Sequence, residues 1–312
     1  MKKIFLGIKA NWLETWFWKV KAPSLLNVGV ELRAFDILKH RKSTLEPIKK
    51  AGCSRLHFGI PQHMPIILST IMNDRWLDIF DLFEYADLVK AINPDLLTTI
   101  EISLYDGDTG KLEILNKQFF ETQLHIFSEY KNRVVVLIPG RTREESLNEI
   151  SMAYHLGYRK FGLACADPMQ RNQNKCKMHV HRDLAIIKQF PGTESYILGL
   201  TSPKNIEEFS EADFLVTKGW YYSAWKFKEK LAITGATKDR IYPILKPCQT
   251  YLTMKGCKKM NIDAWNKIRH NHLRKNAFSN IQVLLEKLYF TKKQTKLKEF
   301  TKCLTKEVKV LG

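Results

Sequence analysis

The chain has 312 residues and carries 50 Lys and Arg against 32 Asp and Glu, a formal net charge of +18. Hydrophobic residues make up 45% of the sequence and aromatic residues 11%, which excludes an intrinsically disordered chain. With 15 Gly and 11 Pro, the composition is neither collagen-like nor of low complexity. The length suits two average domains, or one α/β barrel of roughly 250 residues with an appendage.

Eight short apolar runs, typical of strands buried on both faces, recur along the first two thirds of the sequence. They are Ile4–Ile8, Asn27–Leu32, Arg55–Ile60, Leu97–Ile102, Val134–Ile138, Phe161–Cys165, Tyr196–Leu200 and Asp213–Thr217. Helical patterns lie between them, at Leu77–Ala91, Glu144–Leu156, His181–Phe190 and Pro203–Phe209. This alternation predicts a (β/α)8 TIM-type barrel of the α/β class, with a doubly wound open sheet as the alternative.

The helix at Glu144–Leu156 has the clearest boundary signals. Thr142 is a suitable N-cap, Glu145 follows three residues later as in a capping box, and Gly157 marks the end.

The pattern changes after residue 225. A short apolar piece at Arg240–Leu245 precedes helical patterns at Ile262–Leu273 and Ala277–Tyr289, and a lysine-rich end follows. We therefore expect a barrel domain at 1–225 and a small basic helical appendage at 226–312.

The positive charge is concentrated in the last third of the chain. Residues 217–312 hold 22 Lys and Arg and 6 Asp and Glu, whereas residues 1–216 hold 28 and 26. A net of +16 beside a net of +2 indicates a polyanionic partner, nucleic acid first and an anionic membrane second. A lysine-rich composition in general is the alternative, although it would not leave the first two thirds balanced.

Six cysteines in a chain of this length do not make a disulfide scaffold. The sequence contains no run of 18 apolar residues, so no transmembrane helix is predicted. The start of the chain lacks a signal-peptide pattern. These features predict a cytoplasmic protein that has no membrane partner, and they leave a homo- or heterodimer open.

Four segments carry a resemblance to a known family. Ile4–Leu13 is similar to an "FYLGTxxxxWL" start, and Val134–Asp167 to a "strand–QGG–helix–Gly–strand–GG" passage. Ile197–Pro203 is similar to "MGVGTP", and Ala212–Leu215 to the start of "ADSLAW". By these motifs the chain resembles the tRNA-guanine transglycosylase superfamily, in particular its deazaguanine DNA-modification (DpdA-like) branch, over roughly residues 4–225.

The resemblance implies a base-exchange reaction. A carboxylate attacks the anomeric carbon of a guanosine in DNA or tRNA, and a 7-deazaguanine then displaces the enzyme from the sugar. It implies Asp213 as the nucleophile, although a loop Asp that precedes a strand is an equal alternative. Glu101 falls at the base-recognising position. Asp106 and Asp108 are rival carboxylates after the same strand, with a solvated turn as their alternative.

The chain departs from the family at three motifs. No "DSGGF" follows the third predicted strand, where His57 or His63 is the candidate acid or base, although a lone His is more often structural. At the "QGG" motif, Pro139 replaces the glutamine and Gly140 is the glycine that is retained. At the sixth strand, Cys165 and Ala166 replace the paired glycines. These losses keep a non-catalytic nucleic-acid-binding subunit, partnering a catalytic transglycosylase, as the alternative function.

A structural zinc site is predicted where the family carries one. Its candidate ligands are Cys248, Cys257, His270 and His272, since two Cys and two His complete a tetrahedral site. The alternative is two buried thiols and two surface histidines.

Basic residues in two places are candidate phosphate contacts. They are Arg141 and Arg143 after the fifth predicted strand, and Lys258, Lys259, Lys267, Arg269, Arg274 and Lys275 in the appendage.

A third function, an unrelated barrel enzyme acting on a small anionic substrate, has no motif in its support.

Overall fold

The structure is a computed structural model, and it describes the following residues: 3–8, 28–70, 82–100, 109–139, 142–165, 173–200, 203–225, 228–232, 235–241, 269–286 and 288. The chain divides into two compact units. The first comprises Met1–Leu200 and Glu211–Lys218, and the second comprises Thr201–Ser210 and Gly219–Gly312. Residues 201–210 and 219–225, which the sequence analysis assigned to the barrel domain, therefore group with the second unit.

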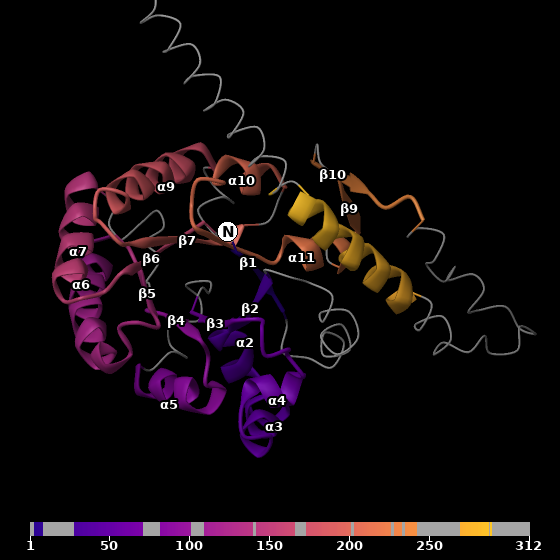
Figure 1. Ribbon diagram of the computed structural model, residues 1–312, viewed down its shortest axis with the longest axis horizontal. Coiled ribbons are helices and arrows are strands. Elements are labelled where there is room, and N and C mark those ends of the chain that lie inside the picture. The colour runs from indigo at the N-terminus through magenta and orange to yellow at the C-terminus, as the bar shows by residue number, and fades with distance from the viewer. Residues whose placement is uncertain are drawn as a thin grey trace, which may run out of the picture. The chain divides into compact units, whose positions relative to one another are not determined.

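Eight parallel strands of the first unit close into a barrel in chain order (Figure 1). They are β1 Lys3–Gly7, β2 Val28–Arg33, β3 Ile66–Ser69, β4 Leu96–Thr98, β5 Val134–Leu137, β6 Lys160–Ala164, β7 Glu194–Leu200 and β8 Phe214–Thr217. Because β1 pairs with β8 as well as with β2, the sheet has no free edge. The (β/α)8 prediction is confirmed, and the open-sheet alternative is excluded.

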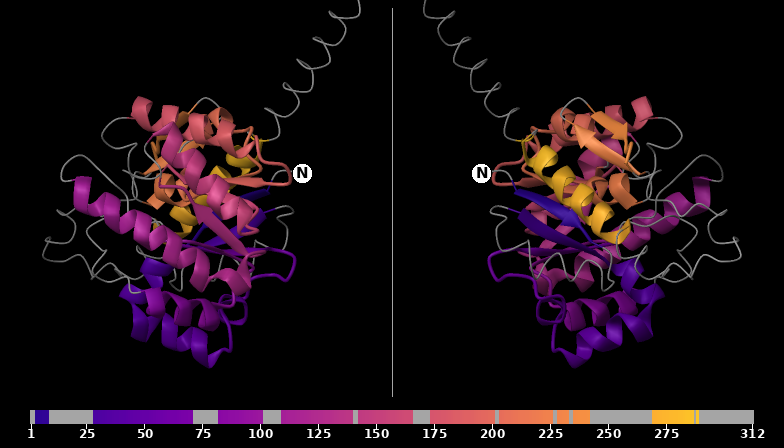
Figure 2. Two further views of the ribbon diagram at one scale, coloured as in Figure 1. Left: turned by 90° about the vertical axis from the view of Figure 1, so that its left-hand side faces the viewer. Right: turned by 90° about the vertical axis from the view of Figure 1, so that its right-hand side faces the viewer.

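Helices connect the strands and lie outside the barrel. In the first unit they are α2 Ala34–Lys39, α3 Leu45–Lys50, α4 Ser54–Phe58, α5 Leu82–Ile92, α6 Thr109–Ile126, α7 Arg143–His155 and α9 Gln173–Ile187, with 3-10 turns at Arg41–Ser43 and Ser128–Tyr130. The short helices α3, α4 and α5 pack against one another (Figure 2).

The predicted cap of α7 is confirmed. The backbone N–H of Glu145 donates to Oγ1 of Thr142 at 3.1 Å, and the backbone N–H of Thr142 donates to Oε2 of Glu145 at 2.9 Å. This reciprocal pair satisfies donors that the first helical turn leaves open.

The prediction of the third strand was wrong. Most of the run Arg55–Ile60 belongs to helix α4, and the strand is β3, at Ile66–Ser69. In α4, Ser54 and Phe58 are four residues apart and both buried, which is helical spacing, and Gly59 ends the helix in the left-handed conformation with φ 66°.

The barrel interior is apolar through its middle. Seven buried side chains form one cluster there: Phe5, Ile67, Val135, Leu137, Tyr196, Leu198 and Val216. A Cβ at Gly29 would lie 2.4 Å from the Phe5 ring, so this glycine lets the ring fill the space beside β2. Residues two positions further along each strand also point inward, which places a second layer toward the carboxyl ends.

The second unit contains α10 Pro203–Glu208, α11 Gly219–Trp225, an antiparallel hairpin of β9 Glu229–Ala232 and β10 Gly235–Lys238, and a helix at 269–286. Asn280 joins these pieces, because its side chain accepts from the Leu231 backbone N–H and donates to the Trp220 carbonyl. Within the residues described, no helix is long and apolar enough to cross a bilayer.

Candidate active site at the carboxyl end of the barrel

Three neighbouring strands bring ionisable side chains together inside the carboxyl end of the barrel. Gly7 is in register with Glu31, and Leu6 with Thr217, so Lys218 comes level with Gly7 on the other side. A Cβ at Gly7 would lie 2.2 Å from Cγ of Lys218 and 2.4 Å from Oε2 of Glu31. The lysine stem and the glutamate carboxylate therefore occupy the space that the glycine leaves open.

Two ion pairs complete a group of four charged residues, which we call the carboxyl-end quartet: Glu31, Arg33, Asp36 and Lys218. Nζ of Lys218 lies 2.9 Å from Oδ2 of Asp36, and Nε of Arg33 lies 3.3 Å from Oε1 of Glu31. Asp36 belongs to the first turn of α2, which follows β2 directly. With both acids ionised, the formal charges of the quartet cancel.

Two members of the quartet are deeply buried and two are partly exposed. The side chains of Glu31 and Lys218 are 1% and 2% exposed, whereas that of Asp36 is 32% exposed. Burial and the charge of Arg33 lower the pKa of Lys218, and the carboxylates of Asp36 and Glu31 oppose that shift. Since apolar residues often replace a buried ion pair without loss of stability, such a group in a barrel mouth favours a functional role.

A hydroxyl pair extends the polar layer to the next strands. The hydroxyls of Thr70, after β3, and Thr98, the last residue of β4, lie 3.0 Å apart. The Thr99 hydroxyl accepts from the Leu137 backbone N–H at 2.8 Å, and this bond ties β4 to β5. Among the described residues of this polar layer, the groups at β3 and β4 are hydroxyls, whereas the ionisable ones lie around β8, β1 and β2.

Asp213 lies at the other end of the barrel. It precedes β8, and its Oδ2 accepts from the backbone N–H and the hydroxyl of Ser195, near the start of β7, at 2.9 and 2.8 Å. In (β/α)8 enzymes the catalytic groups lie at the carboxyl ends of the strands, and the amino ends serve stability. The position and contacts of Asp213 therefore favour a structural role over a nucleophilic one.

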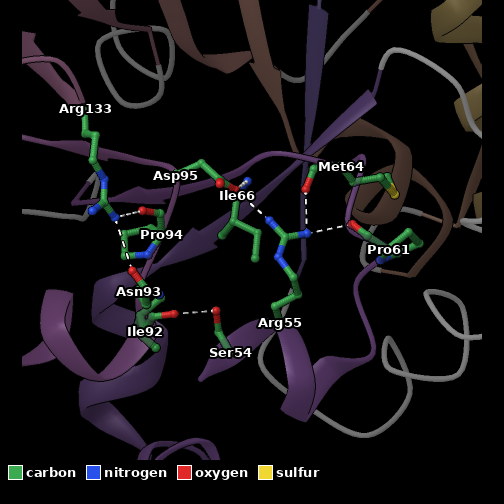
Figure 3. Close-up of polar contacts among 10 residues, drawn as sticks. All are labelled: Ser54, Arg55, Pro61, Met64, Ile66, Ile92, Asn93, Pro94, Asp95 and Arg133. Atoms are coloured by element: carbon green, nitrogen blue, oxygen red, sulfur yellow. Dashed lines mark hydrogen bonds and ion pairs between the residues drawn. The ribbon is translucent and has the colours of Figure 1, made fainter. Parts of the chain in front are cut away.

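Asp95 forms the same kind of contact at two other strands (Figure 3). It precedes β4, and its Oδ2 accepts from the backbone N–H of Ile66, the first residue of β3, at 2.7 Å. Arg55 donates to the same oxygen at 2.7 Å and to the carbonyls of Pro61 and Met64. An aspartate that holds the start of the preceding strand is thus a repeated structural device of this barrel.

Of the other predicted catalytic and base-binding residues, the structure describes His57, His63 and Cys165. His57 lies on α4 with its ring 4.7 Å from that of Phe58, and not at the end of a strand, because α4 replaces the predicted strand. Cys165 is buried directly after β6, but its neighbour Ala164 is the one that packs against the interior cluster. Arg143 is exposed at the first position of α7. Five residues lie outside the described part of the chain: Glu101, Asp106, Asp108, Gly140 and Ala166.

His272 is engaged with an aspartate of the second unit. Its Nε2 lies 2.5 Å from Oδ2 of Asp239, a buried carboxylate that also accepts from Asn276 at 2.6 Å. His270 and His272 are both on the helix at 269–286, and residues two apart on a helix do not face one another. A single zinc ion cannot use both histidines, so the predicted four-ligand set does not fit. Cys248 and Cys257 lie outside the described residues, and the remainder holds no group of three metal-binding side chains.

Part of the predicted phosphate-binding set gathers on that helix. Burial lowers the pKa of His270, and so do the nearby charges of Arg269 and Arg274. Lys275 is exposed on the next turn. The remaining members lie outside the described residues: Arg141, Lys258, Lys259 and Lys267.

No member of the quartet is among the site residues that the sequence predicts. The available signal was a charged residue inside a run predicted to be buried, as Glu31 is, since buried strands rarely hold unpaired charges. A scan against protein-family models and a search of the curated proteins both found no match for this chain.

Proposed function

We propose that this chain is a nucleic-acid base-exchange transglycosylase, which replaces guanine with a 7-deazaguanine in DNA or tRNA. The observation that carries the proposal is the carboxyl-end quartet, because it puts carboxylates and a buried ammonium where (β/α)8 enzymes hold their reacting groups. The reaction itself rests on the resemblance and needs a carboxylate that forms a glycosyl intermediate.

The charge distribution supports a nucleic-acid substrate. Residues 217–312 carry a net charge of +16, and positive charge attracts the phosphate groups of nucleic acids. Within that segment, Arg269, His270 and Arg274 cluster on one helix. Basic side chains of this kind fix the position of the nucleic acid, whereas the barrel supplies the chemistry.

Loops that follow the strands would supply base recognition. Chain order puts Glu101 and Asp106 after β4, Gly140 and Arg141 after β5, and Ala166 after β6. We propose Glu101 for hydrogen bonds to the purine and Arg141 with Arg143 for phosphate. No step is assigned to zinc or to His57.

Base exchange by the full-length chain is the test. Guanine-containing DNA and tRNA are each incubated with a labelled 7-deazaguanine, and we expect label in at least one of them. If neither accepts the label while the chain is folded and binds the nucleic acid, the enzymatic proposal is wrong.

The second candidate is a binding subunit of the same fold. The engagement of Asp213 with Ser195 at the amino end favours it, because the carboxylate that the resemblance implies is not at a catalytic position. Binding without exchange, together with exchange only after a catalytic partner is added, would be the expected pattern for this candidate.

A further inference from the structure

Base exchange at the carboxyl end requires a carboxylate that a sugar can reach. Asp213 is at the amino end, and Glu31 is 1% exposed, so neither meets this requirement. Asp36 does, because it follows β2 at the carboxyl end and its side chain is 32% exposed.

On the basis of the proposed function, we propose that Asp36 is the catalytic carboxylate of this barrel and that Lys218 is the positioning residue that holds it. No motif of the resemblance contains Asp36, and the pairing follows from the barrel's closure alone. The two residues are 182 positions apart in the sequence, yet their charged atoms lie 2.9 Å apart.

The position of Lys218 explains how Asp36 is held. The lysine stem runs past Gly7 inside the barrel, and its ammonium reaches out to the first turn of α2. In the described part of the chain, the other charged groups that act on this ammonium are Glu31 and Arg33 of β2. Since Lys218 is 2% exposed, packing in the barrel interior restricts the position of its ammonium. The ion pair in turn restricts the more exposed carboxylate of Asp36.

The proposed step is a double displacement at the anomeric carbon. One Asp36 carboxylate oxygen bonds to C1′ as the C1′–N9 bond breaks, and the electron pair leaves with guanine, which takes a proton from water. The 7-deazaguanine then gives its N9 proton to water, and N9 bonds to C1′ as the bond to Asp36 breaks. The carboxylate is restored, and nothing is oxidised or reduced.

The first experiment removes the carboxylate without changing its size. In Asp36→Asn we expect base exchange to fall on the order of a thousandfold, as for the loss of a nucleophile, and the covalent protein–nucleic acid adduct to vanish from denaturing gels. The melting temperature shows whether the variant is folded. Exchange within about threefold of wild type by the folded variant would overturn the assignment of Asp36.

The second experiment tests Lys218 through the pH profile. An ammonium 2.9 Å away favours the ionised carboxylate of Asp36. We therefore expect the acid limb of the exchange rate to move to higher pH in Lys218→Met, and Lys218→Arg to restore it in part. A lower rate with an unmoved acid limb would mean that Lys218 is structural only.

Asp95→Asn is the matched control. It also removes a carboxylate paired with a basic residue, since Arg55 lies 2.7 Å from Asp95, but at the amino end of the barrel. We expect it to lower the melting temperature and to leave exchange by the folded protein unchanged. The two proposals fail differently: no exchange by the wild type ends both, whereas exchange that survives Asp36→Asn ends only this one.

Discussion

Gly7 is the residue on which the carboxyl-end quartet depends most directly. A methyl group at this position would lie 2.2 Å from the Lys218 stem and 2.4 Å from the Glu31 carboxylate, both of which are buried. We therefore expect Gly7→Ala to lower the free energy of unfolding by about 1–3 kcal/mol through overpacking, and to lower base exchange. Denaturant titration and the exchange assay measure the two effects.

Gly192→Ala controls for the loss of a glycine. Gly192 has a φ of 73° but no atom near the added methyl, so its cost is backbone strain of about 1 kcal/mol without crowding. An equal loss of stability in both variants, with exchange unchanged in both, would contradict the role given to Gly7.

Asp213 separates the structural from the nucleophilic interpretation. Asp213→Ala leaves the buried Ser195 N–H and hydroxyl without their acceptor, so we expect the free energy of unfolding to fall by about 1–3 kcal/mol. Asp87→Ala, on the exposed side of α5, is the control and should change stability little. An unchanged melting temperature with complete loss of exchange would instead support Asp213 as the nucleophile.

No residue of the carboxyl-end quartet was predicted from the sequence, because none of them belongs to a local motif. Glu31 stands in a run that the apolar pattern marks as buried, so the sequence contains a hint of it. The pairing of Asp36 with Lys218 has no such local signal, because it arises only when β8 closes against β1. The motif at Asp213 identified a candidate residue, but it did not predict at which end of the barrel that residue lies.

Among the elements, α7 has the boundary that the sequence predicts best. Thr142→Ala removes the acceptor for the Glu145 N–H, so we expect a loss of about 1 kcal/mol in the free energy of unfolding. Thr122→Ala on α6 is the control, since this exposed threonine donates to the Gln118 carbonyl within its own helix. Alanine favours a helix interior, so the control should be neutral or slightly stabilising. Equal losses in the two variants would contradict the capping interpretation.

The strands were predictable where an apolar run was unambiguous, as in β5 and β7. The run at Arg55–Ile60 was ambiguous, because a short helix with one buried face and a strand give similar patterns over five or six residues. Its exposed Leu56 and buried Phe58 became informative only once β3 filled the place between β2 and β4. The β9–β10 hairpin, with residues such as Glu229 and Lys238, has no continuous apolar run and was missed.

At the scale of the whole molecule, the split in charge makes a quantitative prediction. Each phosphate contact that a lysine makes contributes about −0.7 to −0.9 to the slope of log affinity against log salt. Replacing Lys258, Lys259 and Lys267 together with Gln should therefore reduce the magnitude of that slope by roughly two to three, measured by filter binding of DNA and of tRNA. The affinity should fall for all sequences alike, since phosphate contacts carry no base information.

Lysines of the first unit provide the control for this experiment. Lys42, Lys49 and Lys90 are exposed there, and the last two lie within 4 Å of an acidic neighbour, Glu46 or Asp87. Replacing these three with Gln removes the same net charge from the protein, so any effect of total charge alone appears in both triple variants. Equal slopes in the two variants would show that the +16 of residues 217–312 attracts nucleic acid only as part of the total charge. A smaller slope only in the C-terminal variant would make that part of the chain the nucleic-acid-binding surface.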